Sequence, residues 1–273
     1  FSIRTFDSLN LALTIISSGG FLPVNELSTI IRENAQIIIF SLLMLFSFFS
    51  LFFTYNLIFL RKKNINFLYE DLHLSIYLVV VVTIFFLFSF NYEFFVTLFA
   101  IISSMTNIGF SLSPGQENLN FIYLILVIIG GSFFSTSSGL RFIKIYSLFK
   151  FSLNQILSFS RPKNVFMNKL IFTKIIFNLD EINKYFLTII IFILSLFLLT
   201  SLLSLSGITF VNSFKLSILT LMNTVNSSIY GLAEFDFYNL QLFSKYCLIL
   251  FMIVGRIELL TILLLLKKFL FKN

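Results

Sequence analysis

The sequence contains no tryptophan, a single cysteine and a single histidine among its 273 residues. Cys247 alone can form neither a disulfide within the chain nor a cysteine-based metal cluster. His73 has only Glu70 and Asp71 near it, without a second histidine or a cysteine at ligand spacing, which disfavours a metal site. The sequence also lacks a nucleotide-binding glycine loop, a Ser/His/Asp set and zinc-ligand spacing. We therefore expect neither an enzyme nor a bound cofactor.

Charged residues are scarce as well, at 11% of the chain, whereas 58% of the residues are hydrophobic. A soluble domain has about 25% charged residues, so this composition indicates an integral membrane protein. The formal net charge of +7 could attract nucleic acid. However, the basic residues cluster between apolar runs, as membrane topology requires. We expect a multi-pass protein in a lipid bilayer with no nucleic-acid partner.

Several apolar stretches have the length of about 20 residues that a membrane-spanning helix needs. They cover residues 36–60, 74–91, 119–140, 185–206 and 246–266. Lysine and arginine collect in cytoplasmic loops, and here they cluster at 61–63, 141–174 and 267–268. With these clusters inside, the spans alternate in direction without conflict. The chain starts at Phe1 rather than Met, and we expect it to be a fragment or a trimmed form.

The segments predicted on the outer side share an unusual pattern. Each contains a short apolar run, namely "SLNLALTII" (8–16), "FFVTLFAII" (94–102) or "FKLSILTLM" (214–222). Such runs are too short to span a membrane and are typical of re-entrant helices. Each is followed by Ser, Thr or Asn and then by Gly beside an aromatic residue, at 17–23, 105–114 and 225–232. The pattern is an internal repeat of span, short helix, polar glycine loop and span.

This repeated unit can build an ion site. Backbone carbonyls of several glycine loops around an axis can replace the hydration shell of a cation, and the carboxyl end of a short helix carries partial negative charge. The alternative is that glycine and serine only allow close helix packing. Three loops in register on one side favour the ion site.

Four motifs resemble the Trk/Ktr/HKT superfamily of potassium transporters. "SSGGF" (17–21) and "TNIGF" (106–110) resemble its second and third filter loops, "GGSFFSTSSGLRFIK" (130–144) its broken span, and "MIVGRIELLT" (252–261) its last span. The resemblance implies an all-α membrane protein of membrane-pore-membrane repeats around one pore, here lacking the first repeat. It divides the chain into a partial second repeat (1–63), a third repeat (64–160), a basic cytoplasmic linker (161–183) and a fourth repeat (184–273).

The resemblance also implies which residues form the ion pathway. The filter positions, with K⁺ at their carbonyls, are Ser17, Ser18, Gly19, Gly20, Thr106, Asn107, Ile108, Gly109, Asn226, Ser227 and Ser228. The gate positions are Gly130, Gly131, Ser132, Ser135, Thr136, Ser137, Ser138, Gly139 and Arg256. Two departures stand out: the fourth filter glycine falls on Ser228 or Ile229, and the later glycines of the 130–139 stretch are largely serine.

We therefore expect potassium uptake across the cytoplasmic (inner) membrane, through a homodimer with a cytoplasmic nucleotide-binding regulatory subunit of the TrkA or KtrA type. Residues 141–174 and the tail "LLLLKKFLFKN" (263–273) are the expected docking region for that subunit. A sodium-permeable or poorly selective relative is the first alternative. A non-transporting structural or assembly membrane protein and a secondary carrier with broken helices are the others.

Overall fold

The computed structural model describes residues 3–24, 27–59, 68–88, 93–112, 119–159, 179–225, 228–232, 235–256 and 268. The described chain is helical, and it contains no named β-strand. Its α-helices are α1 (Thr5–Ser17), α2 (Asn34–Phe48), α3 (Leu51–Phe59), α4 (Leu68–Phe88), α5 (Phe94–Met105), α6 (Asn120–Ile128), α7 (Phe142–Ser158), α8 (Leu179–Leu205), α9 (Phe210–Leu221) and α10 (Leu242–Arg256).

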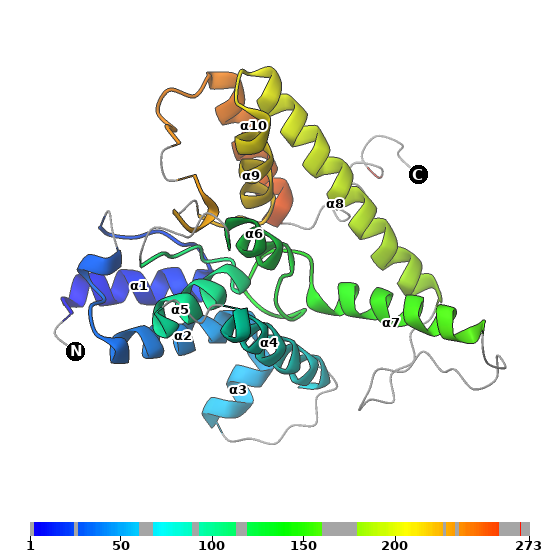
Figure 1. Ribbon diagram of the computed structural model, residues 1–273, viewed down its shortest axis with the longest axis horizontal. Coiled ribbons are helices and arrows are strands. Elements are labelled where there is room, and N and C mark those ends of the chain that lie inside the picture. Colours follow the sequence, from blue (N-terminus) through cyan, green and yellow to red (C-terminus); the bar gives the residue numbers. More distant parts are fainter. Residues whose placement is uncertain are drawn as a thin grey trace.

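The order of the helices repeats. A long helix, a short helix and a further helix follow one another as α4, α5 and α6, and again as α8, α9 and α10. Helix α1 corresponds to the short helices α5 and α9, and helix α2 corresponds to α6 and α10. The short helices α1, α5 and α9 have 13, 12 and 12 residues and match the predicted short apolar runs. In Figure 1, α6 lies at the centre, with α1 and α5 on one side of it and α9 and α10 on another.

Among the described residues, α4 and α8 are the helices long and apolar enough to cross a membrane. They match the predicted spans 74–91 and 185–206. Helix α8 begins at Leu179, inside the segment predicted as a linker. Helix α10 covers the start of the predicted span 246–266, and residues 257–267 lie outside the described chain.

The other two predicted spans are broken, one of them unexpectedly. The stretch 119–140 is helical only to Ile128, as the "GG" motif suggested. The stretch 36–60 was expected to be one helix, but it divides into α2 and α3 at Phe49 and Ser50. Phe49 has extended backbone angles, with φ −79° and ψ 164°. Ser50 then acts as the N-cap of α3, because its Oγ accepts a hydrogen bond from the Phe53 N–H at 3.1 Å.

Two apolar clusters hold the helices together. The larger joins α4, α5, α6, α8, α9 and α10 and contains the fully buried Leu199, Leu203 and Tyr230. The smaller joins α1, α2 and α5 around Leu11, Met44 and Phe99, which have no solvent exposure. The outward faces of α4 and α8 remain apolar, with Leu87 and Leu194 more than half exposed, as expected for helices facing lipid.

Candidate functional site

The three short helices end in the same way. We call the segments that follow them loop A (18–23, after α1), loop B (106–112, after α5) and loop C (222–225, after α9). Each helix is followed by a non-glycine residue in the left-handed region: Ser18 (φ 50°), Asn107 (φ 60°) and Asn223 (φ 51°). The N–H of the next residue bonds back to a carbonyl five residues earlier in all three cases: Gly19 to Thr14, Ile108 to Ser103 and Thr224 to Leu219. This is the Schellman ending of a helix.

The shared ending fixes the structural alignment of the loops. Ser18, Asn107 and Asn223 are equivalent, and two residues further on Gly20, Gly109 and Val225 are equivalent. Gly20 and Gly109 have left-handed φ angles of 71° and 83°, which residues with a Cβ adopt only with strain. The sequence had placed the equivalent of these glycines at Ser228 or Ile229. Those residues instead lie in the 3₁₀ helix Ser228–Tyr230.

Loops A, B and C meet at one point. A Cβ on Gly20 would lie 2.1 Å from the Ile108 carbonyl oxygen and 2.6 Å from Cγ2 of Val225. A Cβ on Gly109 would lie 2.5 Å from the Val225 carbonyl oxygen. Neither position therefore has space for a side chain. The structure thus brings together the predicted filter residues of loops A and B with Val225, which sequence reasoning missed.

Hydroxyl groups on the short helices hold loops A and B. Thr14 Oγ1 donates to the Phe21 carbonyl at 2.8 Å, and Ser103 Oγ donates to the Phe110 carbonyl at 2.9 Å. The two hydroxyls occupy equivalent positions, each four residues before the left-handed residue. The equivalent residue on α9 is Leu219, which has no hydroxyl. Loop C therefore lacks both the glycine and the hydroxyl of its two counterparts.

The remaining predicted filter residues divide into two groups. Ser18, Thr106, Asn107 and Ile108 are buried where the loops meet, whereas Ser17 is exposed and Gly19 is half-buried. Asn107 also links two elements, because its Nδ2 donates to the Val127 carbonyl on α6 at 2.8 Å. Asn226 and Ser227 lie outside the described residues.

We call residues 130–139, between α6 and α7, the central loop. Its ends are joined, because the Gly130 N–H donates to the Leu140 carbonyl at 2.9 Å and the Leu140 N–H donates to the Ile128 carbonyl at 3.1 Å. A Cβ on Gly130 would lie 2.3 Å from the Ser138 carbonyl oxygen. Only glycine allows the two ends of the loop to approach each other this closely.

Backbone hydrogen bonds attach the central loop to the break between α2 and α3. The Ser132 N–H donates to the Phe48 carbonyl at 3.1 Å, and the Ser137 N–H donates to the Ser47 carbonyl at 3.2 Å. In the opposite direction, the Leu51 N–H donates to the Phe134 carbonyl at 3.1 Å. The carbonyls that α2 leaves free at its end are thus satisfied by the central loop.

Charged residues support both breaks, and their roles were not evident from the sequence. Glu70 and Asp71 had been weighed only as neighbours of His73. In the structure, Glu70 Oε1 accepts from the Phe133 N–H at 2.9 Å. Asp71 accepts from the Ser50 N–H at 2.9 Å through Oδ1 and from the Ser50 hydroxyl through Oδ2. The first turn of α4 therefore holds the central loop with one carboxylate and the α2–α3 break with the next.

Arg141 directly precedes α7, which begins at Phe142. Its guanidinium also turns back into the central loop. Nη1 lies 3.1 Å from the carbonyl oxygens of Ser132 and Ser137 and 3.2 Å from that of Ser135. The Arg141 guanidinium therefore fixes the shape of the loop, because hydrogen bonds from a charged donor are stronger than those between neutral groups.

Arg256 connects the central loop to loop A. Its Nη1 donates to Ser138 Oγ at 2.8 Å, and its Nη2 donates to the Ser17 carbonyl at 3.1 Å. Ser18 and Thr136 lie 3.3 Å apart through their hydroxyl oxygens, which forms a second link between the same two segments. The preceding Gly255 lets α10 pack closely against the end of α9, since a Cβ there would lie 2.2 Å from the Leu221 carbonyl oxygen. Predicted filter and gate residues are therefore in direct contact.

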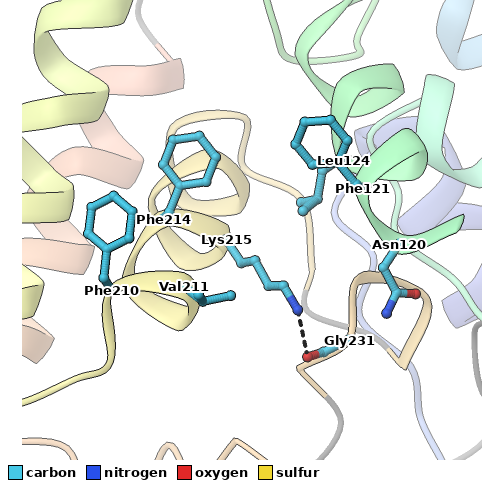
Figure 2. Close-up of a pocket in the computed structure, with 8 residues that line it drawn as sticks. All are labelled: Asn120, Phe121, Leu124, Phe210, Val211, Phe214, Lys215 and Gly231. Atoms are coloured by element: carbon cyan, nitrogen blue, oxygen red, sulfur yellow. Dashed lines mark hydrogen bonds between the residues drawn. The ribbon is translucent and has the colours of Figure 1, made fainter. Parts of the chain in front are cut away.

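A separate pocket lies between α6 and α9 (Figure 2). It has a volume of about 430 Å³, and Figure 2 shows Lys215 reaching across it from α9. The Lys215 Nζ donates to the Gly231 carbonyl at 3.2 Å. A Cβ on Gly231 would lie 2.4 Å from Nδ2 of Asn120. Gly231 thus belongs to this pocket and not to the point where the loops meet.

The arrangement of long, short and broken helices has a counterpart among solved structures. The structure is similar to the crystal structure of the potassium transporter TrkH from Vibrio parahaemolyticus, with a TM-score of 0.83 and 20% sequence identity, over 97% of this chain and 59% of that chain. This similarity confirms the expected all-α membrane fold. No family model matches the sequence, and no curated protein does.

Proposed function

We propose that this chain forms part of a potassium uptake pore in the cytoplasmic membrane. The observation that carries the proposal is the identical ending of α1, α5 and α9, whose loops meet at Gly20, Gly109 and Val225. Carbonyl groups of such loops can replace the water around a potassium ion. The carboxyl ends of the three short helices add partial negative charge at the same place. Loops A and B form the filter together with loop C and the loop of a further repeat.

The central loop and Arg256 form the gate of this pore. The loop joins helices at membrane depth, where non-helical backbone occurs only if it is buried in protein or lines a watery cavity. Thr136 of the loop contacts Ser18, and Arg256 bonds both Ser138 of the loop and the Ser17 carbonyl, so the loop lies beside the start of loop A. An ion leaving the filter would meet the central loop next. Opening then requires the Arg256–Ser138 hydrogen bond or the Thr136–Ser18 contact to separate.

We further propose a homodimer and a cytoplasmic nucleotide-binding regulatory subunit of the TrkA or KtrA type. Their support is the resemblance of the sequence motifs together with the shared fold. The basic segment 141–174 is the proposed contact for the regulatory subunit, and the described part of it is α7 and its N-cap Arg141. Movement of α7 would act directly on the central loop, because Arg141 holds three of its carbonyls.

Growth of a potassium-uptake-deficient host on low potassium tests the proposed function. The full-length protein should restore growth, and Gly109→Ser should give a folded protein with altered ion selectivity, because Gly109 has a left-handed φ and no space for a side chain. Ser201→Ala, at an exposed position of α8 away from the loops, is the control and should leave selectivity unchanged. A full-length protein that carries neither potassium nor sodium would contradict the pore. Unaltered ion flux in Gly109→Ser would favour a structural role for the glycines.

A further inference from the structure

The pocket between α6 and α9 lies where both helices begin. Asn120 is the first residue of α6, Phe210 is the first residue of α9, and both line the pocket (Figure 2). The basic clusters of the sequence predict that α6 runs from the outer side toward the cytoplasm. Lys215 lies five residues after Phe210, which is about 8 Å along the helix axis. The pocket is therefore near the outer head groups of the bilayer.

The walls of this pocket are apolar and open to the outside of the protein. Phe210, Val211 and Phe121 are 63%, 60% and 64% exposed. The stacked rings of Phe210 and Phe214 lie 6.3 Å apart and extend the apolar surface. Exposed apolar surface of this kind marks a contact with lipid, a ligand or a partner. In a membrane fold, the acyl chains of the bilayer can cover it.

Lys215 brings a positive charge into these apolar surroundings. Among the described residues that line the pocket, it alone is charged, and no described carboxylate forms an ion pair with it. Its ammonium group donates to the Gly231 carbonyl at 3.2 Å. An ammonium has three donors, so this bond uses one of them. A charge beside apolar walls is stabilised when an ion of opposite sign pairs with it, which favours an anionic ligand.

A second donor reaches the same place from the other helix. A Cβ on Gly231 would lie 2.4 Å from Nδ2 of Asn120 and 2.9 Å from Nζ of Lys215, so the two nitrogen atoms lie around this glycine. Asn120 is buried, with 7% exposure. An apolar pocket of about 430 Å³ with a few convergent polar groups has the usual form of a ligand site. The two donors select an acceptor, and the charge of Lys215 selects an anion.

We propose that this pocket binds an anionic phospholipid, whose phosphate pairs with Lys215 and whose acyl chains lie along Phe121 and Phe210. The bound lipid joins α6 to α9 and stabilises their packing. A zwitterionic phospholipid carries its own cation beside the phosphate, so it gains less from Lys215. The inference goes beyond the proposed pore function and needs only the membrane fold.

Quenching of a tryptophan by brominated lipids tests this inference in the full-length protein. The sequence contains no tryptophan, so Phe121→Trp adds a reporter at the pocket, and the protein without this change supplies the background. Brominated phosphatidylglycerol should quench the reporter with about five-fold higher affinity than brominated phosphatidylcholine, which is the attraction that one lysine adds toward an anionic lipid.

Two lysine variants of the reporter protein locate the effect. Lys215→Met keeps most of the stem without the charge and should reduce the preference for phosphatidylglycerol to about one. Lys245→Met is the matched control and should keep the preference. Lys245 lies outside the pocket, is half-buried like Lys215, and likewise donates to a backbone carbonyl, that of Tyr238 at 3.0 Å.

Equal quenching by the two lipids in the reporter protein would overturn the inference, as would an equal loss of preference in both lysine variants. Excess inorganic phosphate at constant ionic strength should leave the quenching unchanged, and loss of the preference would identify a soluble anion as the ligand instead. If Lys215→Met does not fold, thermal unfolding of the wild-type protein in detergent decides. Added phosphatidylglycerol should raise its Tm more than phosphatidylcholine does, and equal shifts would overturn the inference. None of these measurements uses ion flux, so a negative result leaves the pore function standing.

Discussion

The two helix breaks, between α2 and α3 and between α6 and α7, satisfy their free backbone groups in different ways. Between α2 and α3 the chain turns over Phe49 and Ser50 and resumes at once, with a serine N-cap. Between α6 and α7 it leaves the helix for the whole central loop. Backbone N–H groups of the central loop are satisfied at the end of α2, because the carbonyls of Phe48 and Ser47 accept hydrogen bonds from them. A loop at membrane depth can therefore be stabilised by a second, smaller irregularity beside it.

Removal of Phe133–Ser137 should have the largest effect, because it eliminates the long break and leaves the short one in place. We expect ion flux through the full-length protein to rise by about an order of magnitude or more, since in the proposed pore the central loop obstructs the path from the filter to the cytoplasm. Flux into proteoliposomes measures this. A deletion variant that folds and conducts at or below the wild-type rate would contradict the gate.

Arg141→Ala should have the next largest effect. It leaves the Ser132, Ser135 and Ser137 carbonyls without their charged donor, and loss of hydrogen bonds to a charged group costs about 3 kcal/mol. We expect lower thermal stability in detergent together with increased flux. Arg141→Lys is the matched control, because its single ammonium can retain part of the interaction. Equal stability of Arg141→Ala and the wild type would show that the short break suffices to hold the central loop.

Leu51→Pro should have the smallest effect and is the most selective change. Leu51 is the first residue of α3, where proline is tolerated, but proline removes the N–H that donates to the Phe134 carbonyl. We expect a loss of about 1 kcal/mol in stability and a modest rise in flux. Leu51→Ala retains the N–H and controls for the lost side chain. If both variants conduct alike, the bond between the two breaks does not restrain the gate.

Local sequence signals predicted much of the fold. The short helices α1, α5 and α9 follow from apolar runs that are too brief to span a membrane, and the end of α6 follows from Gly130 and Gly131. The break at Phe49 and Ser50 could not be predicted in this way, because "FSFFSLFF" contains neither glycine nor proline. It depends on Asp71, which is distant in sequence and reaches Ser50 only in the folded chain.

The candidate site was predictable to a similar extent. Resemblance to known motifs indicated Gly20, Gly109, the central loop and Arg256, and the structure places all of them in one region. The role of Val225 was not predicted, because loop C has no glycine at the matching position. The sequence analysis placed the fourth filter position at Ser228 or Ile229, closer to the next glycine, Gly231. Backbone hydrogen bonds at the end of α9, which no sequence pattern displays, resolve the register.

The joined ends of the central loop keep α6 and α7 in register across the break. Because Gly130 and Leu140 are bonded to each other, the tip around Phe133 can change in length or carry an added group while α6 and α7 keep their relative register. Phe133 is 43% exposed and uses its N–H, not its ring, to reach Glu70. A cysteine there could therefore carry a fluorescent reporter whose signal follows the loop in real time, once the native Cys247 has been replaced.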